Sequence, residues 1–366
     1  MTRVAVVGGG AVGLAAARHL ADAGADVVLY ERGGIASGST GRAAGICYDA
    51  FAEDLDAAIG AESLRRFREL GVLTECPYVW LAREGDDANA DAIREQVPRM
   101  QAHGRNVELV DPEALADRYP QLRTDDVAVA AIAHEAGHVD PGAYAALVAD
   151  ELDSAAAVDV RTDAPVALDD PTTVDSPTGA ESFDAVLVAA GPETKPIVAD
   201  VGVSLALKAY RAQALVTESL HATLPMTYDA TQHVYWRPRD GGLFVGDGAH
   251  PVDPGDWDRQ ADDSFLESAL ERLRAATTLA PRVDRSWAGL CTATPDRDPL
   301  LGEVADGLFV ASGWHGHGFM RSPAMGERVA AQMLGDGDGS VAHYDPDRFD
   351  GDEEFAVVEG MTLDED

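Results

Sequence analysis

The stretch Val4-Ala5-Val6-Val7-Gly8-Gly9-Gly10-Ala11-Val12-Gly13 decides how the fold of this chain begins. Its four apolar residues predict a buried strand. Its glycines fit the pattern G-x-G-x-x-G at the junction with an alanine-rich helix, which we expect to run from Ala11 to about Ala23. A second apolar strand at residues 27–30 closes on Glu31 and completes a βαβ unit, so we expect a parallel, buried sheet.

The residues of this turn suit a dinucleotide. Gly8 permits the tight turn, Gly10 lets a pyrophosphate approach the backbone at the positive end of the helix, and Gly13 allows the helix to pack closely on the strand. Glu31 ends the second strand, where its carboxylate can accept a hydrogen bond from a ribose hydroxyl. The turn therefore predicts a dinucleotide site, although it does not by itself separate NAD from FAD.

The pattern of the opening unit returns after an interruption. Residues 183–191 predict another buried strand that ends at a glycine, whereas the strand-like segments between residues 213 and 246 indicate an antiparallel sheet with hairpin turns. We expect an α/β (α+β) fold in which a Rossmann-like nucleotide-binding domain is interleaved with a smaller substrate domain built on an antiparallel sheet. The expected boundaries are 1–75, 138–205 and 285–340 for the first domain, 76–137 and 206–284 for the second, and 341–366 for an acidic tail.

Three local predictions concern the later part of the chain. Residues 169–182 are predicted to form a polar loop, and the acidic tail is predicted to be solvated. A glycine-rich turn after the strand at residues 308–311 is predicted to lead into the final helix. Ser322 and Pro323 would open that helix, because serine is a good cap and proline a good first-turn residue.

The charge of the chain excludes some partners. It has 28 basic and 64 acidic residues, a formal net charge of −36, and no basic run, so it would repel nucleic acid and anionic membrane surfaces. Lys195 and Lys208 are its only lysines. Acidity combined with lysine depletion favours a protein from a high-salt cytosol, where salt screens self-repulsion; an ordinary acidic protein is the alternative.

Cysteine usage and hydropathy predict a cytoplasmic protein. Cys47, Cys76 and Cys291 are widely spaced and form no CxxC motif, which fits a reducing interior. The N-terminus leads directly into a strand pattern without a secretory leader, and no apolar run approaches membrane-spanning length. We expect no membrane span and no nucleic-acid partner.

A second run of small residues, 35–46, follows Glu31. Its glycines, alanines and hydroxyl residues let backbone amides come close to a flat ligand, although the run alone is also compatible with a flexible loop.

Several stretches together resemble one family. They are the opening βαβ unit, the run Ser39-Thr40-Gly41-Arg42-Ala43-Ala44-Gly45-Ile46, the strand at 183–191, the motif Tyr235-Trp236-Arg237-Pro238-Arg239, and the block from Trp287 to Asp296 with the turn Gly313 to Phe319. On these residues the chain resembles the D-amino-acid-oxidase-like (DAO) family of FAD-dependent oxidoreductases. Its relatives include glycine and sarcosine oxidases, sarcosine and dimethylglycine dehydrogenases, and dye-linked proline dehydrogenases.

The resemblance implies a set of FAD contacts. The second small-residue run would lie along the flavin, Val166 would meet the adenine side, and the turn beginning at Gly313 would face the pyrimidine end of the flavin, where the positive end of the final helix stabilises charge on reduction. His315 and His317 also suggest a metal, but no third ligand is evident, so we expect none. With the glycine turn, the implied cofactor-binding residues are Gly8, Gly10, Ala11, Val12, Gly13, Glu31, Arg32, Ser39, Thr40, Ala43, Ala44, Gly45, Ile46, Val166, Ala190, Gly191, Gly313, His315, Gly316, His317, Gly318, Phe319 and Met320.

The chain departs from its relatives where they attach the flavin or hold the substrate. Arg42 stands where dimethylglycine-dehydrogenase-like relatives carry a flavin-linking histidine, and Gly289 where monomeric sarcosine oxidases carry a linking cysteine, so we expect non-covalent FAD. Cys291 replaces the carboxylate-binding arginine of glycine oxidases, and Met320 replaces the lysine of sarcosine oxidases. Both familiar carboxylate clamps are therefore missing.

Other residues are candidates for substrate binding. A carboxylate prefers a guanidinium, and Arg42, Arg237 and Arg321 lie near the cofactor motifs, although an arginine in so acidic a protein also pairs readily with surface carboxylates. Tyr235 stands at a position that faces the substrate in glycine oxidases. Trp236 and Trp314 are expected either to wall the pocket or to fill core.

The predicted function is oxidation of the C–N bond of a small amino acid or secondary amine (glycine, sarcosine, proline or D-amino-acid type) by hydride transfer to flavin N5. The alternatives are a flavin-dependent 2-hydroxy-acid or polyol dehydrogenase, or a flavin subunit of a hetero-oligomeric amine dehydrogenase. The electron acceptor would be O2 or a quinone, dye or protein carrier. Because no lysine lies in the matched flavin motifs, we favour a dehydrogenase, and the oligomeric state is left open.

Overall fold

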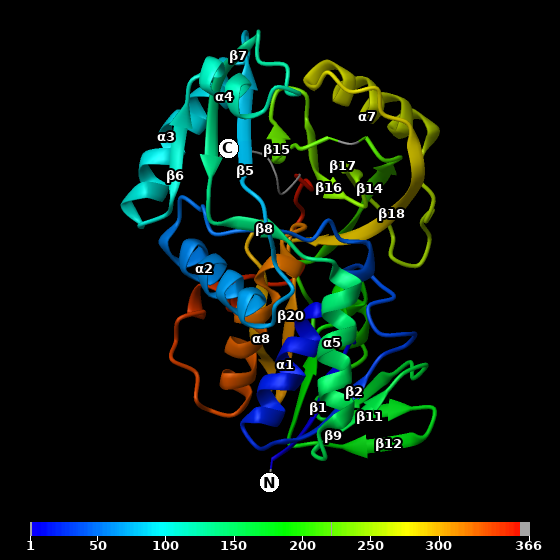
Figure 1. Cartoon of the computed structure of the whole chain (residues 1–366). Helices are drawn as coiled ribbons and strands as arrows, with labels where there is room; N and C mark the ends of the chain where they lie inside the picture. Colours follow the sequence, from blue (N-terminus) through cyan, green and yellow to red (C-terminus); the bar gives the residue numbers. More distant parts are fainter. Residues whose placement is uncertain (1, 221, 359–366) are drawn as a thin grey trace.

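The computed structural model describes residues 2–220 and 222–358. In Figure 1 the molecule has two lobes, with the N-terminus in the lower lobe. The lower lobe contains a six-stranded sheet of order β19-β20-β13-β1-β2-β9. All neighbouring strands in this sheet are parallel except β19 and β20. Its strands are β1 (Arg3–Val7), β2 (Asp26–Tyr30), β9 (Val158–Arg161), β13 (Ala185–Val188), β19 (Leu300–Ala305) and β20 (Leu308–Ser312).

Three long helices cover one face of this sheet: α1 (Ala11–Asp22), α5 (Pro141–Ser154) and α8 (Gly318–Met333). Helices α1 and α8 approach closely, because a Cβ atom on Gly326 would lie 2.5 Å from the Cβ of Ala15. The side chains of Val4, Val6 and Leu14 are fully buried between the helices and the sheet. The first strand and helix of the chain thus pack against its last long helix.

The upper lobe is built on an eight-stranded sheet of order β18-β14-β17-β16-β15-β5-β7-β6. Neighbouring strands in this sheet are antiparallel, except that β15 and β5 are parallel. Inside it, the buried Arg83 Nη2 lies 2.8 Å from Oδ2 of the fully buried Asp229. The strands are β5 (Tyr78–Arg83), β6 (Val107–Val110), β7 (Val127–Ala133), β14 (Lys208–Thr217), β15 (Met226–Asp229), β16 (Val234–Arg239), β17 (Gly242–Pro251) and β18 (Val283–Ala293).

Shorter elements complete the two lobes. The upper lobe carries α3 (Asp87–Ala102), α4 (Pro112–Arg118) and α7 (Asp263–Ala276), and α2 (Asp54–Glu69) packs against α8. The lobes meet at a small sheet in which β8 (Ala136–His138) pairs with β3 (Ile46–Tyr48) and β4 (Thr74–Glu75). The remaining helix, α6 (Thr194–Ala199), follows β13. These observations confirm the predicted combination of a Rossmann-like parallel sheet with an antiparallel one.

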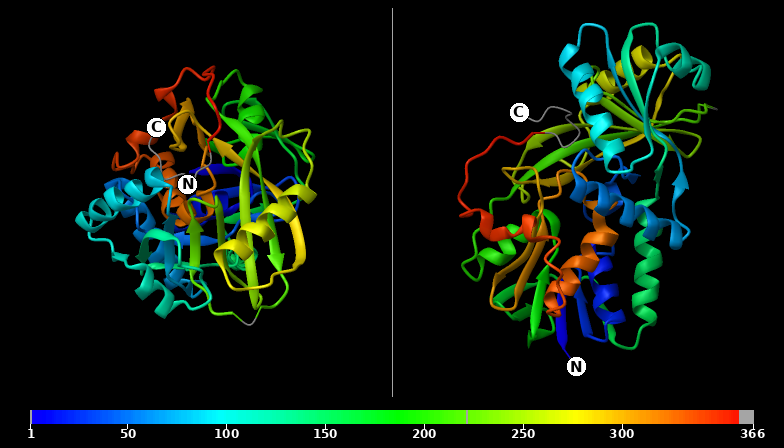
Figure 2. Two further views of the ribbon diagram at one scale, coloured as in Figure 1. Left: turned by 90° about the horizontal axis from the view of Figure 1, so that it is seen from above. Right: turned by 90° about the vertical axis from the view of Figure 1, so that its left-hand side faces the viewer.

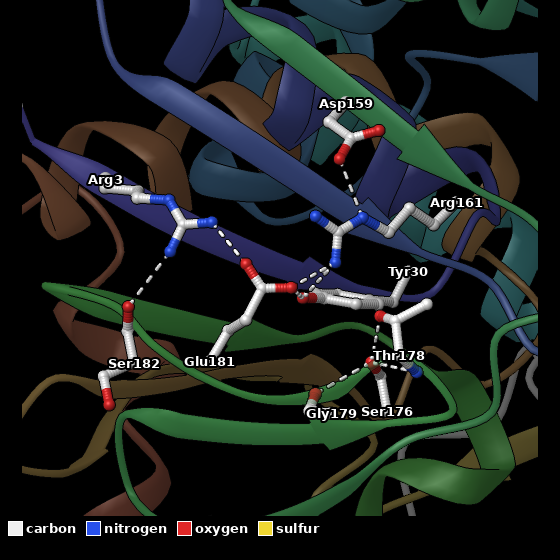
Figure 3. Close-up of polar contacts among 9 residues, drawn as sticks. All are labelled: Arg3, Tyr30, Asp159, Arg161, Ser176, Thr178, Gly179, Glu181 and Ser182. Atoms are coloured by element: carbon white, nitrogen blue, oxygen red, sulfur yellow. Dashed lines mark hydrogen bonds and ion pairs between the residues drawn. The ribbon is translucent and has the colours of Figure 1, made fainter.

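The prediction of a polar loop at residues 169–182 was wrong. The structure has an antiparallel meander there, formed by β10 (Ala167–Asp170), β11 (Thr173–Ser176) and β12 (Gly179–Ser182). Polar side chains hold this meander in place (Figure 3). The carboxylate of Glu181 lies between two arginines of the six-stranded sheet. Arg3 Nη2 is 2.6 Å from Glu181 Oε2, and Arg161 pairs with Oε1. Hydrogen bonds from Arg161 and Arg3 lower the pKa of Glu181 to about 2.

The final helix does not open at Ser322 and Pro323. It begins at Gly318, and Pro323 lies inside it. Proline has no N–H to donate to the carbonyl four residues earlier, and Ser322 Oγ donates to Phe319 O instead, at 2.8 Å. The serine hydroxyl thus satisfies the carbonyl that the proline leaves without its helical partner.

The acidic tail was predicted to be solvated, but over the described part it is packed at some residues and exposed at others. Residues 341–358, here called the C-terminal strap, run along one side of the molecule towards the upper lobe (Figure 2). Val341 and Tyr344 are buried, and Lys208 Nζ donates to Phe355 O at 2.6 Å. Apolar residues within an acidic stretch account for the packing. The remaining predicted tail, residues 359–366, lies outside the described residues.

Candidate active site

The glycine turn is held by backbone contacts. Gly8 N donates to Tyr30 O at 2.8 Å, and Gly8 has a φ of +117°, which favours glycine. A Cβ on Gly13 would lie 2.0 Å from Gly8 O, so only glycine lets the helix come this close to the turn. Gly10 is the N-cap of α1 and makes no side-chain hydrogen bond, so first-turn N–H groups without helical partners can bind an anion there.

Two side chains fix the surroundings of this turn. The Glu31 carboxylate accepts hydrogen bonds from Gly9 N at 2.8 Å and from Gly33 N at 2.9 Å. Thr40 Oγ1 accepts one from Ala11 N at 3.0 Å, which docks the second small-residue run on the start of α1. The acid therefore stands at the end of β2 as predicted, and the second run is folded against the glycine turn.

A cavity of 1040 Å³, here called the large cavity, extends from Glu31 and Val166 to the turn before α8. Its volume is at the upper end of the usual range for small-molecule sites, about 300–1,000 Å³. The cavity includes Arg42 and Tyr235, and all predicted cofactor-binding residues line it except Gly13 and Gly313. Gly13 packs behind Gly8, while a Cβ on Gly313 would meet Thr294 at 2.5 Å. These two glycines thus serve close packing around the cavity.

The upper sheet contributes an aromatic wall to the large cavity. The Tyr235 and Phe244 rings are stacked with centroids 6.2 Å apart, and Phe244 meets Trp287 edge-on at 5.7 Å. Trp287 Nε1 also donates to Arg42 O at 3.2 Å. Phe244 was not predicted to be a site residue, although it lies on β17, which forms a hairpin with the strand β16 that carries Tyr235. Trp314 lines the cavity, whereas Trp236 is fully buried in the core on the other face of the sheet.

The turn before α8 is organised by one histidine. His315 Nε2 accepts a hydrogen bond from Thr294 N at 2.8 Å, and His315 N donates to Thr292 O at 2.8 Å. Burial lowers the pKa of His315 to about 4, so its ring is neutral and accepts at neutral pH. The first turn of α8, residues 318–320, lines the large cavity with its positive helix end. No group of three or more His, Cys, Asp or Glu within residues 2–220 and 222–358 is placed to hold a metal ion.

The three candidate arginines lie in different surroundings. Arg42 Nη1 donates to Ser37 O and, at 2.8 Å, to Gly38 O. Arg237 does not line the large cavity; its guanidinium donates to the carbonyls of Ala44 and Pro238, and burial lowers its pKa to about 10. It therefore attaches the second small-residue run to the upper sheet.

Arg321 faces a second cavity of 640 Å³, here called the small cavity. Its Nη1 is 2.9 Å from Asp56 Oδ1, and its guanidinium carbon lies 5.0 Å from the centroid of the Phe51 ring. Tyr48, His315 and His317 line both cavities. The two cavities are thus neighbours, and sequence reasoning missed the smaller one because its walls come from distant parts of the chain.

A βαβ unit with a glycine turn, a terminal acid and an adjoining aromatic wall defines a dinucleotide-binding protein with a separate ligand face. The chain belongs to the DAO family, described as "FAD dependent oxidoreductase", which matches residues 3–332. It is therefore an FAD-dependent oxidoreductase. The resemblance found in the sequence is confirmed, and the large cavity, the N-terminus of α1 that lines it and Glu31 fit the cofactor.

Two curated relatives match over most of their length. A glycine oxidase from Geobacillus kaustophilus (strain HTA426) is 27% identical over 357 residues, covering 89% of this chain and 91% of the relative. A gamma-glutamylputrescine oxidoreductase from Escherichia coli (strain K12) is 24% identical over 380 residues, covering 93% of this chain and 87% of the relative.

Solved structures show the same fold. L-proline dehydrogenase from P. horikoshii superposes with a TM-score of 0.87 and 24% identity, covering 95% of this chain and 97% of that one. Glycine oxidase from Geobacillus kaustophilus gives a TM-score of 0.85 and 23% identity, covering 95% and 100%. Within the described residues, no helix combines the length and apolar character needed to cross a lipid bilayer.

Proposed function

We propose that this protein oxidises the C–N bond of a small amino acid or secondary amine. The substrate loses a hydride and a proton, and water hydrolyses the resulting imine to a carbonyl compound and an amine. Bound FAD supplies the hydride acceptor. The observation that carries the proposal is the large cavity, in which the nucleotide-binding turn, the aromatic wall and the positive end of α8 face one space. The relatives named as amino-acid and amine oxidoreductases support it.

The residues of the large cavity have separate roles in this proposal. Gly8, Gly10 and Glu31 would hold the dinucleotide, and the second small-residue run would lie along the flavin ring. Tyr235 would form the substrate wall, with its apolar ring against the ligand and its hydroxyl as a polar contact. The positive end of α8 would stabilise negative charge that develops on reduction.

We propose that the FAD is not covalently bound. Gly289 faces Arg42, since a Cβ on this glycine would lie 3.3 Å from the arginine Cβ. Neither residue has a nucleophilic side chain that attaches a flavin. Acid precipitation of the purified protein should therefore leave the yellow colour in the supernatant, and colour that stays in the protein pellet would contradict the proposal.

The proposal also assigns cofactor binding and substrate binding to different segments of the chain. The segments 1–75, 138–205 and 285–340 would bind FAD, and 76–137 and 206–284 would form the substrate domain. We also propose a cytoplasmic location, which fits three free cysteines, and an acceptor other than O2, because neither lysine lies beside the large cavity.

The decisive experiment is anaerobic reduction of the purified holoprotein by a panel of candidate substrates. Glycine, sarcosine, L-proline, D-proline, D-alanine and N-methyl-γ-aminobutyrate are compared with lactate and glycerol, and flavin absorbance is followed. We expect an amine to bleach the flavin and the hydroxyl compounds to leave it oxidised. Bleaching by lactate or glycerol alone would contradict the proposal, as would a preparation that no amine bleaches. Reoxidation by air and then by an artificial dye separates an oxidase from a dehydrogenase.

We further propose that the protein works in high salt. The net charge of −36 means that the acidic side chains repel one another in dilute buffer. At molar salt the Debye length falls to about 3 Å, and this repulsion is screened. The expected result is a thermal midpoint that rises steadily with KCl. A protein that is equally stable in dilute buffer would contradict a halophilic origin and leave the flavin chemistry untouched.

A further inference from the structure

Consecutive residues at the start of α8 face different cavities. Met320 lines the large cavity and Arg321 lines the small one. Tyr48 and His317 contribute to both, and Tyr48 Oη is 3.5 Å from His317 Nε2. This separation is long for a hydrogen bond, so the polar contact between the two side chains is weak. At this point the side chains of Tyr48 and His317 separate the two cavities.

The guanidinium of Arg321 is only partly satisfied. The residue is 7% exposed, and Asp56 pairs with its Nη1. Its buried Nε has no hydrogen-bond partner among the described residues. Tyr344 Oη donates to the same Asp56 Oδ1 at 2.8 Å, so the carboxylate divides its charge between two partners. Arg321 thus lines the small cavity with a carboxylate partner that it shares, and a guanidinium forms its strongest pairs with carboxylates.

The other charged groups around the small cavity, Arg297 among them, are already engaged. Asp296 pairs with Arg348, Asp298 with His343, and Glu53 with Arg99. The remaining deep wall is apolar and includes Trp80, Ile93, Val97 and Met100. The small cavity therefore combines one incompletely satisfied cation with a surface that suits methylene groups.

We propose that Arg321 binds the carboxylate of the substrate in the small cavity while the C–N bond to be oxidised lies in the large cavity. This inference rests on the proposed amine oxidation. It names the substrate class as an amino acid whose carboxylate is separated from the reacting carbon by a methylene chain, such as an N-methyl ω-amino acid. An α-amino acid carries both groups on one carbon and cannot place them on opposite sides of Tyr48 and His317.

The test uses a homologous series: sarcosine, N-methyl-β-alanine, N-methyl-γ-aminobutyrate and the next longer homologue. Each is paired with an N-methylalkylamine of the same length that lacks the carboxylate. We expect kcat/KM to rise with chain length, and each longer acid to exceed its carboxylate-free analogue. Sarcosine as the best substrate would overturn the inference and leave amine oxidation standing, whereas a flavin that no amine reduces would overturn the proposed function itself.

Arg321→Met tests the residue, and Arg328→Met is the matched control. Arg328 lies on the same helix, pairs with Glu62 of α2 at 2.8 Å as Arg321 pairs with Asp56 of α2, and also has a buried Nε without a partner among the described residues. It lines neither cavity. Arg321→Met should lower the preference for acid over carboxylate-free amine about 10- to 100-fold, mainly through KM, because hydrogen bonds to charged groups contribute about 1.5–3 kcal/mol. Arg328→Met should leave this preference unchanged, and equal losses in both variants would overturn the inference.

A binding measurement covers the case in which Arg321→Met fails to fold. Hexanoate is titrated calorimetrically into wild-type holoprotein and into Asp56→Asn, which removes the carboxylate that competes for Arg321 but keeps a hydrogen-bonding side chain. We expect hexanoate to bind the variant at least about threefold more tightly. Unchanged or weaker binding would overturn the inference, because a merely structural ion pair gives no gain in carboxylate affinity when it is broken.

Discussion

The large and the small cavity are built from different kinds of groups. The large cavity is lined at the cofactor motifs by glycines, alanines and the N-terminal end of α1, and these lining residues come from continuous stretches of sequence. The small cavity is lined by side chains of α2, α3, β5, α8 and the C-terminal strap, among them the ion pair of Asp56 and Arg321. A ligand site formed by the backbone is thus encoded in a local stretch of sequence, whereas a site formed by side chains depends on how distant segments pack together.

Gly13→Ala is expected to have the largest effect, because it alters the backbone site itself. The added methyl would lie 2.0 Å from Gly8 O, and neither the turn nor the helix can move without disturbing the other. We expect a loss of about 3 kcal/mol in the free energy of unfolding and a protein purified with little FAD. Urea unfolding and the ratio of flavin to protein absorbance measure the two effects.

Gly34→Ala is the control for this substitution, since a Cβ there meets nothing within 4 Å. It should retain the wild-type FAD content. If Gly13→Ala also retained full FAD, the close contact between helix and turn would not be needed for the cofactor, and the backbone account of the large cavity would fail.

Asp56→Leu should affect the small cavity without emptying the large one. It leaves the charge of Arg321 buried without its carboxylate, which should lower the free energy of unfolding by about 2 kcal/mol. We place the cost below that of a fully buried pair because the Asp56 side chain is 15% exposed. The FAD content should stay at the wild-type level.

The double variant Asp56→Leu/Arg321→Met tests the cause. Removing both charges should restore part of the lost stability, because no buried charge then lacks a partner. Additive losses in a urea double-mutant cycle would show that the two side chains do not act as a pair.

A smaller effect is expected from acid at the wall that the cavities share. Burial lowers the pKa of His317 to about 3 and that of His315 to about 4, from a usual value of 6.5. As the pH falls below 6.5, these histidines become protonated in the unfolded chain but stay neutral in the folded one. The free energy of unfolding should therefore decrease between pH 6.5 and 4. Urea midpoints across this range should fall less steeply in His317→Gln than in wild type. A slope in His317→Gln equal to that of wild type would contradict this account.

The smallest effect should come from the surface end of the small cavity. Arg348 of the C-terminal strap pairs with Asp296 at 2.8 Å, and the aspartate side chain is 36% exposed. Arg348→Ala should cost about 1 kcal/mol or less in urea unfolding. A cost comparable with that of Asp56→Leu would mean that the strap is integral to the small cavity and does not merely cover it.

The sequence predicts the parts of the site that depend on local chemistry. The glycine turn, Glu31 and the second small-residue run can be recognised because each needs particular residue types at fixed spacing, and they line or support the large cavity. The fold class follows for the same reason. Tyr235 and Trp314 also lie in the cavity, whereas Trp236 faces the core, since alternate residues of a strand point to opposite sides.

The rest depends on contacts that no local pattern specifies. The meander at 167–182 is polar because Glu181 is placed to meet Arg3 and Arg161, which are remote in sequence. Arg321 could be selected as a cation near the cofactor motifs, but its partner Asp56 and the small cavity follow only from the packing of α2 against α8.

The close packing of α1 against α8 has a consequence for synthesis. Helix α1 ends at Asp22 and α8 begins at Gly318, yet Gly326 meets Ala15 directly. A ribosome that adds about 5–20 residues per second needs roughly 15–60 s to make the intervening chain. During that interval the apolar face of the first helix has no final partner, so the nascent chain must be shielded from aggregation until almost the whole polypeptide has emerged.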